Sequence, residues 1–133
     1  MSAVVLAAAA QNVAAQTPAL SCSGAQKPKL LAELLFGRDI TDRARVSEAA
    51  WREFVAREIT PRFPEGLTII DATGQWRDRK NGRIVREPSK LVMIVLPGKA
   101  DDQTRLGAVV SAYKHRFHQQ SVGVVIQPAC ASF

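Results

Sequence analysis

Residues 67–98, LTIIDATGQWRDRKNGRIVREPSKLVMIVLPG, contain the pattern that decides the fold. The part at 67–76 is rich in β-branched residues, which favour a strand. The polar segment 78–82 ends in Asn-Gly, a strong signal for a hairpin turn, and residues 83–96 return as a second strand. This strand ends in LVMIVLP, which is apolar on both faces and indicates a central position in a sheet. The segment therefore predicts a β-hairpin, with Pro88 at a bulge or at the true start of the second strand.

A helix is predicted on each side of this hairpin. Before it, Ser47 can cap a helical segment that Pro61 and Pro64 close, since proline cannot continue the hydrogen-bond ladder. After it, Asp101 or Asp102 can cap a second helix. In both helices the apolar residues recur at helical spacing and form one face. These residues are Trp51, Phe54, Val55, Ile59 and Phe63 in the first helix, and Leu106, Val109, Val110, Tyr113 and Phe117 in the second.

Two further strands complete the pattern, at 29–36 (KLLAELLF) and at 121–127, which is rich in valine and ends at Pro128. The run at 29–36 is too short for its periodicity to separate strand from helix, so the order of the elements decides for a strand. The order strand, helix, strand, strand, helix, strand predicts an α+β, ferredoxin-like βαββαβ fold. Such a fold has a four-stranded antiparallel sheet with two helices on one face, in strand order 4-1-3-2.

The amino-terminal segment indicates export. Residues 4–10 form a short apolar run, and Val13-Ala14-Ala15 has the small residues of a cleavage site, so we predict a signal peptide at 1–15. No Lys or Arg precedes the run, which leaves an incorrect start site or an alanine-rich tail as alternatives. The run is too short to span a bilayer. We therefore expect an irregular leader at 16–28 and a single periplasmic or secreted domain at 29–133.

The two cysteines, Cys22 and Cys130, stand near the two extremities of the chain. An even pair in an exported domain predicts a disulfide, with two free thiols or a lipidated Cys22 as the alternatives. In the predicted strand order, the first and last strands are antiparallel neighbours. The start of the first strand and the end of the last strand then lie at the same end of the sheet, which is where the fold would bring the two cysteines together.

Several runs, taken together, resemble a family of secreted bacterial proteins, the domain of unknown function 3574. The runs are AELLFGR (32–38), VSEAAWREFV (46–55), ITPRFPEGLTIIDATGQWRD (59–78), IVREPSK (84–90) and PACASF (128–133). The resemblance covers residues 22–133 and implies an export signal and a cysteine near each end of the domain. The family has no established activity, so the resemblance implies no catalytic residues.

The formal net charge of +6 favours anionic partners. The alternative is that the basic residues only solvate the surface, because they are spread along the chain. Nucleic acid is disfavoured, since the predicted central strands carry aliphatic side chains instead of the aromatic residues that stack on bases. The remaining candidates are a small anionic ligand and an anionic component of the cell envelope.

Glu33 is the most unusual residue of the first strand, because a carboxylate on a central strand needs a partner or water. It could bind a ligand or act as a base on the open face of the sheet, or it could form a salt bridge with a neighbouring basic residue. A second candidate is an anion-binding rim on the hairpin, where arginines could hold phosphate or carboxylate. The rim would consist of Trp76, Arg77, the basic turn through Arg83, Arg86 and Lys90, together with Arg38 after the first strand.

No motif indicates a cofactor or a metal. Serine hydrolase, P-loop and dinucleotide motifs are missing from the sequence, and bridged cysteines leave no thiol nucleophile. His115 and His118 could share a helix face, but the sequence places no third ligand near them, and two exposed histidines are the preferred interpretation. We therefore expect neither a cofactor nor a metal site.

These observations favour a non-enzymatic domain that binds a ligand or partner through the open face of its sheet. Because an apolar open face needs a cover, self-association as a dimer is expected. The alternative is a small dimeric enzyme with a pocket near Glu33, Arg38 and Trp76. That alternative requires the three side chains to meet in one cavity.

Overall fold

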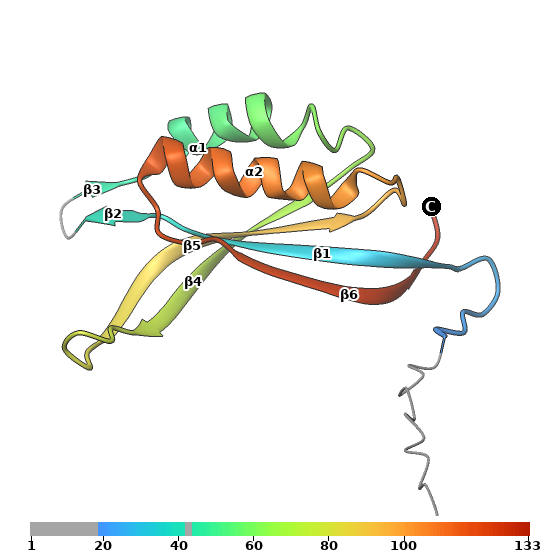
Figure 1. Cartoon of the computed structure of the whole chain (residues 1–133), viewed down its shortest axis with the longest axis horizontal. Coiled ribbons are helices and arrows are strands. Elements are labelled where there is room, and N and C mark those ends of the chain that lie inside the picture. Colours follow the sequence, from blue (N-terminus) through green and yellow to red (C-terminus); the bar gives the residue numbers. More distant parts are fainter. Residues whose placement is uncertain (1–18, 42–43) are drawn as a thin grey trace, which may run out of the picture.

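The protein is a two-layer α+β domain, in which both helices cover one face of an antiparallel sheet (Figure 1). The structure, a computed structural model, describes residues 19–41 and 44–133. The predicted signal peptide at 1–15 and the first part of the predicted leader lie outside the described residues. The predicted ferredoxin-like fold class is confirmed.

The sheet has the strand order β4-β5-β1-β6, with β1 (Lys27–Gly37) and β5 (Ile84–Val95) in the centre. The edges are β4 (Thr68–Arg77) and β6 (Gly123–Ala131). All neighbouring strands are antiparallel. Counted in chain order, β1, β4, β5 and β6 are the first to fourth strands of this sheet, so the order is the 4-1-3-2 order expected from the sequence. The run LVMIVLP is central as predicted.

Two prolines lie inside strands, contrary to prediction. Pro88 marks neither a bulge nor a strand start, because β4 and β5 pair without interruption from Arg77 opposite Ile84 onwards. Its carbonyl accepts from the Arg38 amide, so the backbone nitrogen and oxygen of Pro88 face away from β4. The pairing with β4 therefore requires no N–H donor from the proline. Likewise, β6 does not end at Pro128, which pairs with Leu30. The Leu30 carbonyl accepts from Leu96 on the β5 side, so the imide nitrogen of Pro128 faces the open edge of β6.

Both predicted helices form. The hydroxyl of Ser47 caps α1 (Glu48–Phe54) by accepting from the Ala50 amide at 3.1 Å. A short π-helix, η1 (Val55–Ile59), continues α1 and was not predicted. α2 spans Asp102–Phe117. The carboxylate of Asp102 accepts from the amides of the preceding turn, at Gly98 and Lys99, while the Asp101 side chain makes no capping bond.

A small hairpin, β2 (Asp39–Thr41) with β3 (Ala44–Arg45), joins β1 to α1 and was also not predicted. The Val46 amide closes it by donating to the Arg38 carbonyl at 2.8 Å. The hairpin sets the point at which α1 begins above the sheet.

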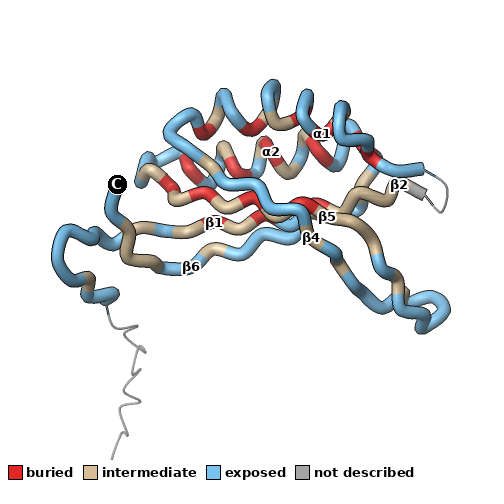
Figure 2. Tube along the Cα trace, turned by 180° about the vertical axis from the view of Figure 1, so that it is seen from behind, coloured by how far each residue is buried: buried red, intermediate tan, exposed pale blue. Residues whose placement is uncertain are grey.

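The hydrophobic core lies between the helices and the sheet, where Figure 2 shows the buried residues. Its centre is an aromatic cluster around Phe36 of β1, whose ring centroid lies 4.7 Å from that of Tyr113 and 5.2 Å from that of Trp51. The Tyr113 hydroxyl donates to the Gly37 carbonyl at 2.8 Å, and burial raises its pKa well above its usual value. The other buried apolar residues of the hydrophobic core are Ala32, Leu34, Val46, Phe54, Ile59, Phe63, Val92, Ile94, Leu96, Leu106, Val109 and Phe117.

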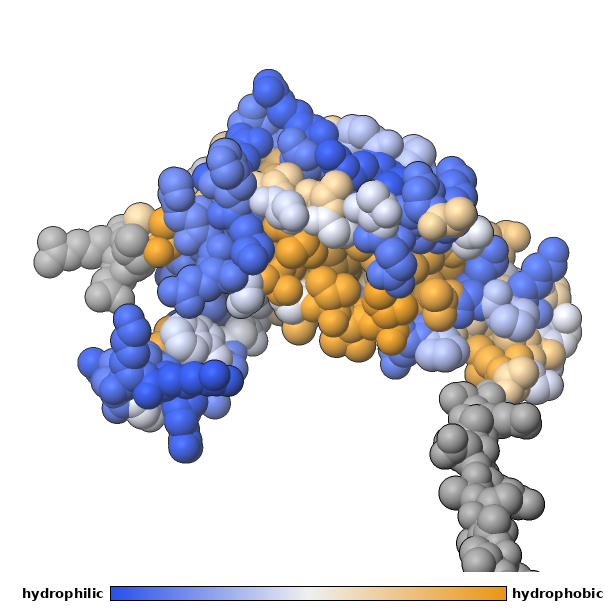
Figure 3. Space-filling view, viewed as in Figure 1, coloured by the Kyte–Doolittle hydropathy of each residue, from blue (hydrophilic) through white to orange (hydrophobic). Residues whose placement is uncertain are grey.

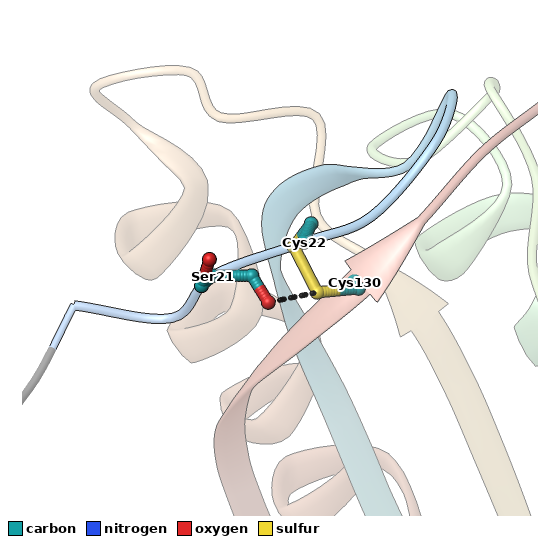
Figure 4. Close-up of a disulfide and its surroundings, with 3 residues drawn as sticks. All are labelled: Ser21, Cys22 and Cys130. Carbon is teal, nitrogen blue, oxygen red and sulfur yellow. Dashed lines mark hydrogen bonds between the residues drawn. A yellow bond between two sulfur atoms is a disulfide. The ribbon is translucent and has the colours of Figure 1, made fainter.

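Cys22 and Cys130 form the predicted disulfide (Figure 4), with their Cα atoms 5.6 Å apart. Cys130 lies in β6, opposite Pro28 of β1, and Cys22 precedes β1. The bridge therefore joins the beginning of β1 to the end of β6 at one end of the sheet. A cross-link over a loop of this length stabilises the folded state by about 4 to 5 kcal/mol in the chain-entropy model.

Candidate functional site

The face of the sheet opposite the helices is apolar and uncovered by any other described element (Figure 1). Side chains directly opposite each other in antiparallel strands share a face, so the register identifies the residues on this open face. Figure 3 shows apolar side chains gathered below the helices, over the sheet. The open face consists of Leu31, Leu35, Ile70, Leu91, Met93, Val95 and Val125, all of which are partly or fully exposed.

Glu33 lies in the middle of this open face. Its neighbours across the sheet are Met93 on β5 and Val125 on β6, and its side chain is partly buried. No hydrogen bond or ion pair joins Glu33 to another described residue. The salt bridge with a neighbouring basic residue, which the sequence left open as the alternative to a ligand-binding role for Glu33, is therefore not formed within the described part of the chain. The carboxylate faces outward from an apolar surround.

The hairpin of β4 and β5 extends well beyond the rest of the sheet. β1 ends at Gly37, opposite Ser89, and the hairpin continues past this point as a two-stranded ribbon. We call residues 73–88 the arm. The arm bends toward the open-face side of the sheet (Figure 1), and Figure 3 shows a hollow between the arm and the apolar patch. Trp76 and Val85 are paired on the same face as Glu33, and Trp76 is 49% exposed.

Arg38 and Lys90 lie on the other side of the sheet, beneath the start of α1. Arg38 donates to the Val46 carbonyl at 2.6 and 3.0 Å and to the Glu48 carboxylate at 2.5 Å. The Lys90 side chain is only 5% exposed, and its Nζ contacts Glu48 at 3.0 Å as well as the Asp71 carboxylate. These four charged side chains form one network, which we call the Lys90 network.

The Lys90 network keeps its members charged. Burial opposes the charge on Lys90, but the hydrogen bonds to Asp71 and Glu48 outweigh burial and hold its pKa above the usual value. The hydrogen bonds from Lys90 lower the pKa of Glu48 and of Asp71. A nucleophilic lysine needs a lowered pKa, so this arrangement suits a structural ion pair.

The candidate residues from the sequence are thus divided between surfaces. Glu33 and Trp76 lie on the open-face side, while Arg38 and Lys90 belong to the Lys90 network on the covered side, and Lys90 is buried instead of lining an exposed rim. The side chains of Arg77 and Arg86 are exposed on the opposite face of the arm from Trp76. The four basic residues of the expected rim therefore share one side of the sheet and the arm, with Trp76 on the other side. The described chain does not bring Glu33, Arg38 and Trp76 into the single cavity that the enzyme alternative requires.

A further acidic residue, Glu87, was not singled out in the sequence. Its carboxylate lies over Gly37 and accepts from the Asp39 amide at 3.1 Å. A Cβ at position 37 would lie 2.8 Å from a Glu87 oxygen, so the glycine makes room for this contact. The only available signal was the glycine that ends the strand. Glu87 fixes the base of the arm to the end of β1.

The described part of the chain also has an apolar cavity of about 360 Å³ at the disulfide end of the sheet, remote from the arm. The cavity is lined by Leu20, Pro28, Lys29, Leu30, Leu96, Gly98, Asp102 and Pro128.

His115 and His118 are exposed, and among the described residues no group of three or more His, Cys, Asp or Glu side chains could hold a metal ion. None of the helices in the described ranges is both long and apolar enough to cross a membrane.

Comparison with known proteins identifies the family. The model of the family described as "Protein of unknown function (DUF3574)" matches residues 31–133. The chain belongs to this family. The match confirms the resemblance found in the sequence, and the described function of the family is unknown. No curated protein matches the DUF3574 chain.

Solved structures share the fold of this DUF3574 protein. A phage SAM lyase in complex with S-methyl-5'-thioadenosine has a TM-score of 0.60 at 19% identity, and the alignment covers 88% of this chain and 97% of the lyase. CutA from Synechococcus elongatus has a TM-score of 0.51 at 13% identity, with 84% of this chain and 83% of CutA covered. At these identities the likeness shows the fold alone.

Proposed function

We propose that this protein is an exported binding domain that works as an assembly of identical copies, in which a second copy covers the open face of the sheet. The observation that carries the proposal is the continuous apolar open face, which spans all four strands and has no cover within the described chain. Exposed apolar patches of this kind mark interaction sites. A second copy is the simplest cover, because the same patch is present on every molecule.

The exposed residues of the open face support this proposal. Leu35 is 48% exposed, Ile70 43% and Val125 45%, and they come from three different strands. Burial of apolar surface contributes about 25 cal/mol per Å², so covering these side chains gives association a large hydrophobic term. The covered face has no comparable need, since its central side chains are buried beneath the helices.

The proposal is tested by one pair of neighbouring valines. Val125 lies on the open face opposite Glu33, and Val124 lies on the covered side opposite Leu34, with exposures of 45% and 42%. We expect the wild-type protein to associate in size-exclusion chromatography with light scattering. Val125→Asp should convert it into a folded monomer, because a second carboxylate beside Glu33 would be trapped in the interface. The matched control Val124→Asp should leave association intact. A wild-type protein that stays monomeric at high concentration would contradict the proposal.

We assign the domain to the periplasm or the exterior of the cell. The disulfide supports this assignment, because structural disulfides persist in oxidising compartments. Mass spectrometry of the protein from fractionated host cells should find it outside the cytoplasm, oxidised and cleaved within its first 20 or so residues. A full-length, reduced protein in the cytoplasmic fraction would contradict the assignment.

A second candidate function is a small enzyme whose site forms between copies. The observation that favours it is the fold shared with the phage SAM lyase over 97% of the length of that enzyme. Glu33 and Trp76 are the open-face residues that such a site would use. Isothermal titration of the assembled protein with S-methyl-5'-thioadenosine tests this candidate. Binding that Trp76→Ala abolishes would support it, and the lack of any heat of binding would favour the non-enzymatic proposal.

A further inference from the structure

The arm is a two-stranded ribbon that leaves apolar side chains exposed on both faces. Trp76 is 49% exposed on the open-face side, and Ile84 is 42% exposed on the other. Isolated two-stranded hairpins are marginally stable in water and normally need a surface to pack against. The described chain supplies such a surface only at the base of the arm, where Glu87 contacts Gly37 and Asp39.

The arm also carries a concentrated positive charge. Residues 73–88 contain five basic and two acidic side chains, so this short segment supplies half of the formal net charge of +6. In the body of the protein, most arginines make ion pairs with carboxylates, for example Arg62 with Glu58. The arginines of the arm make none with the described residues. These are Arg77, Arg79, Arg83 and Arg86.

Glu33 has the complementary need. It is the one charged side chain among the described open-face residues that lie in register with Leu31 to Leu35, and no described cation pairs with it. A carboxylate within a patch that becomes buried loses its water, so a buried interface requires a positive partner for it. Without such a partner, Glu33 would oppose the association that the apolar residues favour.

The length of the arm matches the depth of Glu33 within the sheet. From Ser89 to Ile84 the arm extends β5 by about 17 Å beyond the end of β1, at about 3.3 Å per residue. Glu33 lies about 13 Å inside the end of β1, on the same scale. An arm that enters the open face of a second copy where the β1 strand of that copy ends, and that follows this strand inward, therefore reaches Glu33 with its tip.

We infer that, in the assembly, the arm of one copy lies across the open face of a second copy and brings the guanidinium groups of Arg79 and Arg83 to the partner's Glu33. Trp76 and Val85 then pack on the apolar residues around that carboxylate. This inference rests on the proposed function, because it assumes that the open face meets a second copy. It adds a specific contact, in which the open face of each copy needs the arm of the other copy to neutralise Glu33.

Charge reversal with analytical ultracentrifugation tests the inference. Glu33→Arg alone should weaken association about tenfold or more, since it sets like charges against each other. The double change Arg79→Glu with Arg83→Glu should do the same. A chain that carries all three changes should recover most of the wild-type affinity, because the ion pairs are restored with opposite polarity. Association of the wild type should also weaken as salt is raised.

The matched control is Arg52→Glu with Arg57→Glu on exposed positions of α1 and η1, which changes the net charge by the same amount as the arm variant. This control should associate like the wild type, and circular dichroism should show every variant to be folded. The inference is overturned if the reversed chain stays as weak as the single variants, or if the control weakens association equally. Association that Val125→Asp abolishes, but that ignores all charge reversals, would leave the proposed function standing and remove only the role of the arm.

Discussion

Leu34 and Leu35 are adjacent, chemically identical and in opposite situations. Leu34 is fully buried beneath the helices, whereas Leu35 is 48% exposed on the open face. The two faces of one sheet therefore have similar composition but different cover. The covered face stabilises the fold of a single chain, and the open face is available for contacts between chains. The difference shows that apolar content alone does not reveal which task a strand residue performs.

The largest effect should come from truncating these leucines. Leu34→Ala should lower the free energy of unfolding by about 2 to 5 kcal/mol, because it leaves a cavity in the core. Leu35→Ala should cost less than about 1 kcal/mol in the isolated chain, since little buried area is lost there, but it should weaken association. Urea unfolding at low protein concentration separates the two. Equal losses of stability would show that the open face is covered within one chain.

The disulfide offers a change that lies outside both faces. Replacing Cys22 and Cys130 by serine should lower the free energy of unfolding by about 2 to 5 kcal/mol, with the chain-entropy value as the upper end, because the unfolded chain gains freedom. The affinity between folded copies should stay unchanged, since the bridge is remote from Glu33 and the arm. Thermal unfolding and ultracentrifugation of the double variant check the two statements. A loss of association by a folded variant would link the bridge to the interface.

The Lys90 network gives the stability of the covered face a pH dependence. Glu48 and Asp71 have lowered pKa values in the folded state, so their contribution is present above the unfolded values of 4.5 and 3.8 and is lost as the pH falls through the folded values. Lys90→Met should destabilise the protein at pH 7, because Glu48 and Asp71 lose their ion pairs with Lys90. The loss should be small, since both carboxylates are exposed and regain water.

Comparing urea midpoints of wild type and Lys90→Met at pH 7 and pH 3 tests this linkage. The gap between the two proteins should narrow at pH 3. Glu65, whose pKa the exposed Lys99 lowers, remains in both proteins and provides an internal reference. A gap that is the same at both pH values would show that Lys90 acts through packing alone.

The smallest effect is spectroscopic and compares the two tryptophans. Trp51 is 2% exposed on the covered side, and Trp76 is 49% exposed on the arm. In Trp51→Phe, which retains an aromatic ring, the emission reports Trp76 alone. Acrylamide should quench this emission at low protein concentration and less as copies associate, if the arm packs on a second copy. Quenching that is independent of concentration would place Trp76 outside the interface.

Much of the fold could be predicted because several local patterns agreed. The Asn-Gly turn, the Ser47 cap and the run LVMIVLP each indicated one element, and the order of the elements along the chain predicted the strand order. The strand ends could not be predicted at Pro88 and Pro128, because a proline is tolerated where its backbone faces away from the neighbouring strand. That orientation depends on the register between strands and not on local sequence.

The candidate site was less predictable, because it depends on which face each side chain takes. Glu33 was placed correctly among the leucines of β1, since alternation along one strand is a local property. Arg38 and Lys90 were grouped with the basic hairpin by charge alone. Their carboxylate partners, Glu48 and Asp71, come from distant elements, and only the folded chain brings those partners to Lys90.

The position of the disulfide also determines how the domain would respond to mechanical load. Cys22 and Cys130 are 108 residues apart in the sequence and 5.6 Å apart between Cα atoms. A force applied on the outer side of both cysteines passes through the sulfur–sulfur bond, and the chain between them carries no tension. The intact bridge thus makes the folded domain a short, inextensible link, and only reduction would expose the sheet to the pull.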